Sequence, residues 1–207
     1  MGKEEHREML FWTKEEYLKF ADVMMDKPVS YYAFEILYWC GLRMGELLAL
    51  TPADFNFETH TLRINKSYQR LHREDVITPP KTLKSNRTIK MPQFLCDEMQ
   101  DYMEMLYGLK EDERIFTISK SYLHHEMNRG SKVSGVKRIR VHDLRHSHVS
   151  LLINMGFTVL AIADRMGHES IDITYRYAHL FPSEQTQMAE QLDIERMEKL
   201  NGEKSGQ

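Results

Sequence analysis

The sequence predicts an α+β fold that is mainly α-helical and carries a small antiparallel sheet or hairpin. Apolar residues recur at helical spacing over the first 50 residues and again after residue 92, whereas they alternate with polar residues between 61 and 91. The chain has 207 residues, of which 42% are apolar and 29% are charged, so it is too apolar to be intrinsically disordered. We therefore expect a single helical domain around one sizeable core.

Three helices are predicted in the opening segment. The first spans 13–26, because Thr13 and Glu16 form a capping box ahead of a helical apolar pattern. The second spans 30–41, with a serine as its N-cap and a glycine as its stop, and the third spans 44–50, before a proline.

A change of pattern marks the predicted sheet. Residues 61–65 and 87–91 alternate apolar with polar side chains, and 75–78 is a short run between them. We expect these three segments to form an antiparallel sheet with one buried face and one basic face. Segment 79–86 contains prolines and lysines and is predicted to be an exposed basic connection.

The remainder of the chain is predicted to be helical. A helical apolar pattern runs from residue 92 to Gly108, and later helices are expected to stop at glycines 130, 135, 156 and 167. Segment 158–168, followed by a short helix from Ser170, has the pattern of a helix-turn-helix. A DNA-binding module without catalysis is therefore a rival interpretation.

The composition excludes some classes of protein. No apolar segment is long enough to cross a bilayer, and the first ten residues lack the apolar core of a signal peptide, so we expect a cytoplasmic protein with no membrane partner. Cys40 and Cys96 lie in apolar helical patterns, which favours reduced core thiols over a disulfide.

Positive charge is localised although the net charge is −3. Lysine and arginine are concentrated in segments 63–90 and 129–145, whereas acidic residues gather near both ends of the chain. A charge run is usually a solvated surface, but two basic segments in a net-acidic chain also fit a localised site for a polyanion.

Three histidines fall within one short segment, at His142, His146 and His148. The pair at i and i+4 lacks the intervening glutamate of a zinc protease motif, and no cysteine lies nearby, so we predict no metal site. His142 and Arg145 are three residues apart and share one face of a helix.

Five motifs together resemble the tyrosine recombinase (phage integrase) family, in the style of integrases from phages and conjugative transposons. They are Gly41–Leu47, Pro80–Arg87, His142–Ser147, Met166–His168 and Tyr175–His179. Each motif alone is weak, but their order and spacing match the family from residue 11 to about residue 181. Met166 stands where leucine is usual. Family members normally carry a core-binding domain ahead of the catalytic domain, and here the catalytic pattern already begins at Phe11.

The resemblance implies the tyrosine recombinase catalytic fold over 11–181. We expect residues 1–10 to be the remnant of a linker and 182–207 to form a C-terminal helix and tail, so the chain looks like a catalytic fragment. The implied function is site-specific cleavage and rejoining of DNA through a 3′-phosphotyrosine, for integration or excision of a mobile element. The reaction requires no metal, nucleotide or other cofactor.

The resemblance also implies a set of catalytic residues. They are Arg43, Lys81, His142, Arg145, His168 and Tyr177. We prefer Tyr177 to Tyr175 as the nucleophile because it lies nine positions after His168 and is followed, after one residue, by His179.

The chemistry of strand transfer explains these residue types. In-line attack adds charge to a phosphodiester that is already anionic, and the two arginines and His168 are suited to stabilise that charge. A phenol with a pKa near 10 needs a proton acceptor, which is either a neighbouring side chain or the phosphate itself. His142 is the candidate side chain, unless it only orients a neighbour. Lys81 is the expected proton donor to the departing 5′-oxygen, with Lys84 as the alternative.

The predicted partner is double-stranded DNA. Residues expected to contact phosphates without reading sequence are Lys66, Arg70, Arg73, Lys84, Arg87, Lys137, Arg138 and Arg140. The resemblance further implies self-association on DNA as a tetramer, excisionase or DNA-bending accessory proteins, and a location in the cytoplasm of a bacterial host. A type IB topoisomerase would use nearly the same catalytic residues and is a second alternative.

Overall fold

The predicted α+β fold, rich in helix, is confirmed. The computed structural model describes residues 9–80, 82–180, 188–190 and 192–194. Its helices are α1 Lys14–Met24, α2 Pro28–Cys40, α3 Met44–Leu47, α4 Gln93–Met105, α5 Lys120–Ser134, α6 Asp143–Asn154, α7 Val159–Met166 and α8 Asp172–Tyr175. The strands are β1 Phe55–Asn56, β2 Thr61–Ile64, β3 Ser67–Leu71, β4 Glu74–Thr78 and β5 Arg87–Lys90. Short 3-10 turns occupy Pro52–Asp54, Leu83–Ser85 and Ala178–Leu180.

The first predicted helix is confirmed as α1. Its capping box is present, since the Thr13 N–H donates to Glu16 Oε2 at 2.8 Å and the Glu16 N–H donates to Thr13 Oγ1 at 3.3 Å. The prediction that Gly130 ends a helix is wrong, because this glycine lies inside α5. A Cβ at this position would lie 2.4 Å from Cε2 of Phe20, so the glycine lets α5 approach α1 closely.

Helix α2 begins earlier than predicted. Pro28 occupies its first turn, where its fixed φ suits a helix and its missing N–H costs nothing. Ser30 is therefore not the N-cap; it is buried, with Oγ 2.9 Å from the Tyr122 hydroxyl. The predicted stop at Gly41 is confirmed, with φ at +63°. Helix α3 is shorter than predicted and ends at Leu47.

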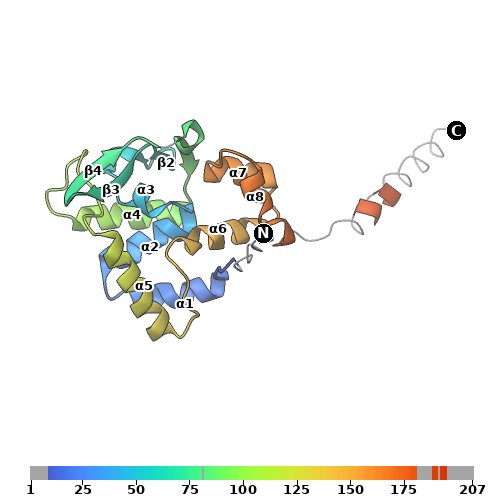
Figure 1. Ribbon diagram of the computed structural model, residues 1–207, viewed down its shortest axis with the longest axis horizontal. Coiled ribbons are helices and arrows are strands. Elements are labelled where there is room, and N and C mark those ends of the chain that lie inside the picture. Colours follow the sequence, from blue (N-terminus) through green and yellow to red (C-terminus); the bar gives the residue numbers. More distant parts are fainter. Residues whose placement is uncertain (1–8, 81, 181–187, 191, 195–207) are drawn as a thin grey trace, which may run out of the picture.

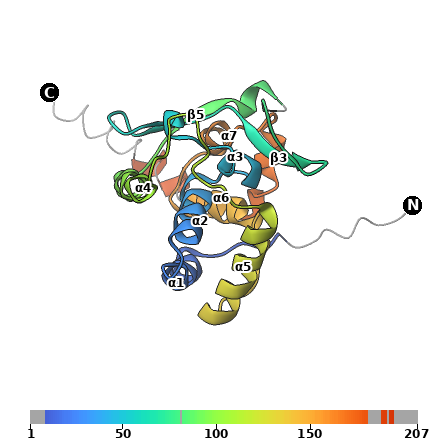
Figure 2. The ribbon, with the colours of Figure 1, turned by 90° about the vertical axis from the view of Figure 1, so that its left-hand side faces the viewer.

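The strands form two sheets rather than the single sheet predicted. Strand β2 pairs with β1 and β5, and the antiparallel register of β2 and β5 matches Thr61 with Lys90. Strand β4 instead pairs with β3, which the sequence analysis did not predict. The β3–β4 turn, His72 and Arg73, has positive φ at both residues, and this hairpin projects away from the helices (Figure 2).

Two apolar clusters organise the molecule. The main core lies among α1, α2, α4 and α5 and contains Cys40 and Cys96, which are buried free thiols as predicted. A smaller cluster lies between α6 and α7 and includes Met166 and Tyr177. Figure 1 accordingly shows α7 and α8 together beside α6 and apart from α1 and α5.

Two predictions concern the terminal segments of the chain, 1–10 and 182–207. Of the expected C-terminal helix and tail, only 188–190 and 192–194 are among the described residues, and both are helical. The expected N-terminal linker lies outside them except for its last two residues. Within the described ranges, no helix is both long and apolar enough to span a membrane.

A buried carboxyl on α2 makes the stability of the fold pH-dependent. Glu35 is 4% exposed, and burial raises its pKa from 4.5 to about 7, although the Tyr17 hydroxyl donates to it at 2.6 Å. Because the folded state prefers the protonated carboxyl, the stability it contributes is complete below pH 4.5 and is lost as the pH rises through about 7.

We therefore expect Glu35→Gln to flatten the pH dependence of unfolding. At about pH 8 the variant should be more stable than the wild type by on the order of 2–3 kcal/mol, and at about pH 5 the difference should be below ~1 kcal/mol. Urea unfolding at both pH values measures this, with Glu58→Gln, on an exposed turn, as the control. An equal effect of Glu35→Gln at both pH values would contradict the expectation.

Candidate active site

Arg145 joins two of the predicted motifs. The residue is 4% exposed; its Nη1 donates a 2.7 Å hydrogen bond to the Gly41 carbonyl, and its Nη2 donates to the Met166 carbonyl. Gly41 lies two residues before Arg43, and Met166 lies two residues before His168. The guanidinium therefore fixes both segments, and it keeps further N–H donors for an anionic ligand.

Arg43 shares a carboxylate with a second arginine. Its Nη1 lies 2.7 Å from Glu46 Oε1, and Arg87 donates to both Glu46 oxygens at 3.0 and 3.1 Å. Burial alone would raise the pKa of Glu46, but the hydrogen bonds and charge of Arg87, with the charge of Arg43, lower it to about 2. The ionised carboxylate thus holds Arg43, whose side chain is 38% exposed, at the surface of the site.

His168 lies just after the end of α7, where Gly167 has a positive φ of 62°. The histidine is 6% exposed, and its Nδ1 lies 2.8 Å from Thr174 Oγ1 on α8. Burial lowers its pKa to about 4, and the charges of Arg145 and Arg43 act in the same direction. If the threonine hydroxyl donates to Nδ1, the neutral ring carries its proton on Nε2 and can donate it to a phosphate oxygen.

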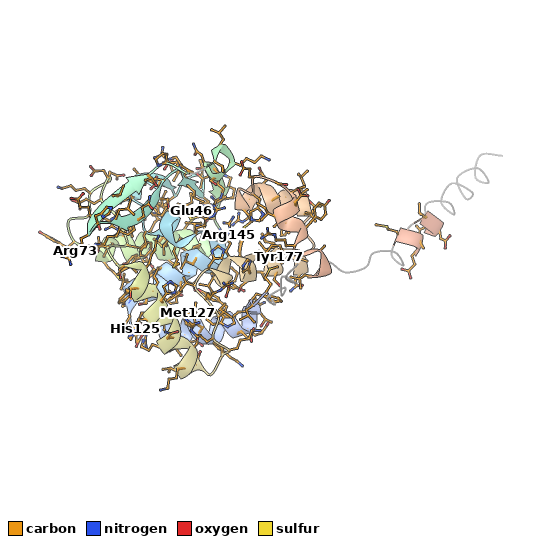
Figure 3. All side chains as sticks on the ribbon, viewed as in Figure 1. Glu46, Arg73, His125, Met127, Arg145 and Tyr177 are labelled. Atoms are coloured by element: carbon orange, nitrogen blue, oxygen red, sulfur yellow. The ribbon has the colours of Figure 1, made fainter. Side chains whose placement is uncertain are left out.

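The hydroxyl of Tyr177 lies inside the site. The residue is 4% exposed, and its hydroxyl is hydrogen-bonded to Nδ1 of His146, with the two ring centroids 5.7 Å apart. Burial raises the pKa of Tyr177 to about 12, and the charge of Arg145 opposes that rise. Tyr175, the alternative nucleophile, is 53% exposed on α8. Figure 3 shows Glu46, Arg145 and Tyr177 along one oblique line, which runs from α3 past α6 to the chain that follows α8.

The histidine that contacts the Tyr177 hydroxyl is His146, whereas His142 was predicted as its proton acceptor. His142 is exposed at the start of α6 and meets His146 edge-on, with centroids 5.3 Å apart. Burial, and then the charge of His142, lower the pKa of His146 to about 4, so its neutral ring can accept a hydrogen bond from Tyr177. The pKa of His142 is also lowered, first by loss of surrounding water and then by Arg145.

No site role was predicted for Glu46 or His146 from the sequence, although the structure places both beside predicted catalytic residues. Both had a signal, because Glu46 follows Arg43 by three residues, and His146 follows His142 by four, on the same helical face. The sequence could not predict that Glu46 pairs with Arg87 or that His146 contacts Tyr177, because the partners in each pair are far apart along the chain.

The two least exposed of the residues predicted to contact phosphates, Arg87 and Lys66, are held in ion pairs. The Arg87 side chain is 6% exposed and paired with Glu46, and it also donates to the Arg165 carbonyl at 3.1 Å. Lys66 Nζ lies 2.6 Å from a carboxylate oxygen of Asp54. Buried charges need such partners, so these placements suit structural roles better than the DNA contacts predicted.

The remaining predicted DNA-binding residues are exposed. They are Arg70, Arg73, Lys84, Lys137, Arg138 and Arg140. Three of them also form ion pairs: Arg70 with Asp75, Lys137 with Glu16 and Arg140 with Asp143. Arg73 lies at the outer edge of the molecule (Figure 3), whereas Lys84 Nζ donates to the Glu169 carbonyl at 3.2 Å, beside His168. Lys84 borders a groove of about 450 Å³ between the segment that leads into β5 and the C-terminal end of α7. His168 and Arg87 also line this groove.

Two further predictions about the site concern Lys81 and metal. Lys81 lies outside the described residues, so its side chain is not placed here. Among the residues that are placed, no group of three or more His, Cys, Asp or Glu side chains is arranged to hold a metal ion.

The fold and this arrangement of arginines, histidines and a buried tyrosine define a class of protein. The chain belongs to the phage integrase family, whose model matches residues 11–184. Among its relatives is the ICEBs1 integrase of Bacillus subtilis (strain 168), which is 32% identical over 202 residues; the match covers 90% of this chain and 55% of that protein.

Solved structures show the same fold. The Tn1549 transposon integrase in complex with a circular intermediate DNA superposes with a TM-score of 0.78 at 21% identity, over 93% of this chain and 68% of that one. The catalytic domain of bacteriophage HP1 integrase superposes with a TM-score of 0.63 at 20% identity, over 88% of this chain and 95% of that one. The chain thus spans about half of its ICEBs1 relative and nearly all of an isolated catalytic domain.

Proposed function

We propose that this chain is the catalytic domain of a site-specific DNA recombinase. It would cleave and rejoin strands through a 3′-phosphotyrosine to integrate or excise a mobile element. The observation that carries the proposal is the position of Arg145, whose guanidinium ties the segment before Arg43 to the segment before His168. The charge of Arg145 also opposes the rise in the pKa of Tyr177, as expected of a cation on the nucleophile's side of the site.

The phosphodiester would be bound by Arg43, Arg145 and His168. The two arginines carry permanent charge, and a neutral His168 adds a hydrogen bond without a proton transfer. Because Arg145 is held by main-chain carbonyls and Arg43 by Glu46, little reorganisation is needed as charge develops on the nonbridging oxygens.

The nucleophile would lose its proton during attack rather than before it. The pKa of Tyr177 is about 12 and that of His146 about 4, so the proton stays on the phenol in the resting site. Attack on phosphorus lowers the pKa of the phenol, and His146 is then placed to accept the proton. His142 would orient His146.

The two alternative functions are less well supported. Helix α8 has four residues, which is too short for the recognition helix of a helix-turn-helix. A type IB topoisomerase would share the catalytic residues, but the relatives reported above are named integrases. The two activities differ in their products. A recombinase exchanges strands between two duplexes, whereas a topoisomerase only relaxes a single supercoiled circle.

Several partners are proposed on the same basis. Double-stranded DNA would be the substrate of this chain, in keeping with the Tn1549 integrase, which was solved in complex with a circular intermediate DNA. We further propose a tetramer on DNA, accessory excisionase or DNA-bending proteins, and action in the cytoplasm of a bacterial host.

Binding to DNA should depend steeply on salt, because the exposed basic residues are suited to contact phosphates. We expect Arg73→Ala, at the tip of the projecting hairpin, to reduce the slope of log affinity against log salt by about one. Lys132→Ala, on the exposed face of α5, is the control and should leave the slope unchanged. Titrations of a labelled duplex across a salt series measure both; equal slopes for wild type and Arg73→Ala would contradict the contact.

Lys81 is proposed as the acid that protonates the departing 5′-oxygen. Lys81→Ala should cleave an ordinary strand slowly, but should recover most of its rate when sulfur replaces the bridging oxygen, because a thiolate leaves without a proton. Arg43→Ala should recover much less. The measurement is the cleavage rate of Lys81→Ala and Lys84→Ala on the oxygen-bridged and sulfur-bridged substrates. If the sulfur substrate does not restore the rate of Lys81→Ala, the assignment is rejected. If it restores the rate of Lys84→Ala alone, the role belongs to Lys84.

The proposed function is tested by trapping the covalent intermediate. A duplex library with a nick beside a randomised segment lets the short cleaved fragment diffuse away, so an attached strand cannot be rejoined. We expect adducts that survive detergent, and sequencing of the attached DNA should return an enriched site. The same library without any adduct at high protein concentration would argue for a binding module without catalysis.

A further inference from the structure

The nucleophile and His168 belong to a small structural unit at one side of the molecule. This unit, residues 158–180, comprises α7, α8 and the 3-10 turn that follows them. Its apolar cluster is separate from the main core and consists of Val149, Ile153, Ile162, Met166 and Tyr177. Apolar packing thus joins the unit to α6, whereas Arg43 lies on the other side, between α2 and α3.

One side chain of this unit reaches across to the rest of the domain. The guanidinium of Arg165, on α7, donates from Nη2 to the Trp39 carbonyl at 3.3 Å and from Nη1 to the Lys90 carbonyl at 3.0 Å. Trp39 is in the last turn of α2 and Lys90 is the last residue of β5, so both carbonyls sit where regular pairing ends. Arg165 therefore contacts two elements, α2 and β5, that meet only in the folded domain.

The third contact of Arg165 is a buried histidine. Nε of Arg165 donates to Nε2 of His148 at 3.1 Å, and His148 is 2% exposed on α6. Burial, and then the charge of Arg165, lower the pKa of His148 to about 3, so this ring is neutral and can accept from a cation. Gly41 makes room for it, since a Cβ at that position would lie 2.7 Å from Cδ2 of His148.

These contacts determine where α7 sits. The residue after Arg165 is Met166, whose carbonyl accepts from Arg145, and two positions later lies His168. The Arg165 carbonyl in turn accepts from Arg87, which holds Glu46. A shift of α7 would therefore displace two groups together: the Met166 carbonyl, which accepts from Arg145, and His168, which is proposed to bind the phosphodiester.

We propose that Arg165 and His148 form a positioning pair that fixes α7, and with it His168 and Tyr177, against the half of the site that carries Arg43. Neither residue touches the reacting atoms. The inference rests on the proposed function, because its consequence for rate requires Tyr177 to be the nucleophile. Misplacement of a reacting group by about 1 Å can cost on the order of 100-fold in rate, so a modest movement of the unit suffices.

The test combines hydrogen exchange with single-turnover cleavage of the enriched nicked duplex. Arg165→Met removes all three donors and should slow adduct formation by on the order of 100-fold at saturating DNA, with affinity changed less than about threefold. Exchange should rise within 158–180 but not in α1 or α5. Arg114→Met is the matched control, because Arg114 also donates to main-chain carbonyls, at Leu48 and Phe116, and none of its described contacts is with α7.

Variants of His148 separate positioning from simple loss of packing. His148→Gln keeps an acceptor near the position of Nε2 and should retain most of the rate, whereas His148→Phe fills the space without an acceptor and should be slow. Adding His148→Phe to Arg165→Met should cost little more, because the pair is already broken.

Three results would overturn the pair. They are an unchanged rate in Arg165→Met, exchange that rises evenly over the whole chain, and equal defects in His148→Gln and His148→Phe. Absence of any adduct in the wild type would instead reject the proposed function. In that case, the exchange in 158–180 still decides whether Arg165 holds the unit in place.

Discussion

Tyr177→Phe is expected to bind DNA as the wild type does and to form no covalent adduct. The substitution removes only the phenolic oxygen, and the ring, which packs in the cluster between α6 and α7, is kept. The expected loss is complete, because no other group replaces the attacking oxygen. Gel shifts give the affinity, and denaturing gels of the nicked duplex give the adduct.

Tyr175→Phe is the control for this experiment. Tyr175 lies two residues before the proposed nucleophile and is 53% exposed, without a histidine partner among the described contacts. It should form adduct at close to the wild-type rate. Adduct formation that persists in Tyr177→Phe and disappears in Tyr175→Phe would show that the nucleophile is assigned to the wrong residue.

Arg145→Lys should be the next most severe change. The guanidinium bonds two carbonyls in different segments, and a lysine ammonium lacks the planar fork that makes both contacts while facing a phosphate. We expect the rate of adduct formation to fall on the order of 100-fold to 1,000-fold at saturating DNA. Stability should fall as well, because the Gly41 and Met166 carbonyls would lose a charged donor.

Arg114→Lys is the control that separates the effect of Arg145→Lys on stability from its effect on the rate of adduct formation. Arg114→Lys changes a partly buried guanidinium that also donates to main-chain carbonyls, outside the site. It should lower the unfolding midpoint and leave the adduct rate of the folded protein within about threefold of wild type. Similar rates for Arg145→Lys and Arg114→Lys would remove Arg145 from the chemistry.

Elements with a local cause were predictable from the sequence. The capping box of α1 and the glycine stops at Gly41, Gly135 and Gly167 depend on residues a few positions apart, and the structure has them as expected. Gly130 looked like another stop, but its reason is the closeness of Phe20 on a different helix. Spacing alone does not distinguish a glycine that ends a helix from one that lets two helices touch.

Long-range pairing explains what was missed. Strand β3 has a mixed polar pattern in which only Tyr68 is buried, so nothing in its own sequence marks it as the partner of β4. The same holds for charge: Arg87 belongs to a basic segment, but its partner Glu46 lies 41 positions away. The family motifs were enough to predict Arg43, Arg145 and Tyr177 as site residues. The contact of His146 with Tyr177 could not be predicted, because it depends on how α6 packs against the chain that follows α8.

The most direct test of the account identifies the atom to which DNA becomes attached. Adduct from the nicked library is digested with nuclease and protease, and the modified peptide is sequenced by mass spectrometry. We predict a single nucleotide joined through its 3′-phosphate to Tyr177. A nucleotide joined through a 5′-phosphate, or carried by any other residue, would contradict the central claim that Tyr177 is the strand-cleaving nucleophile.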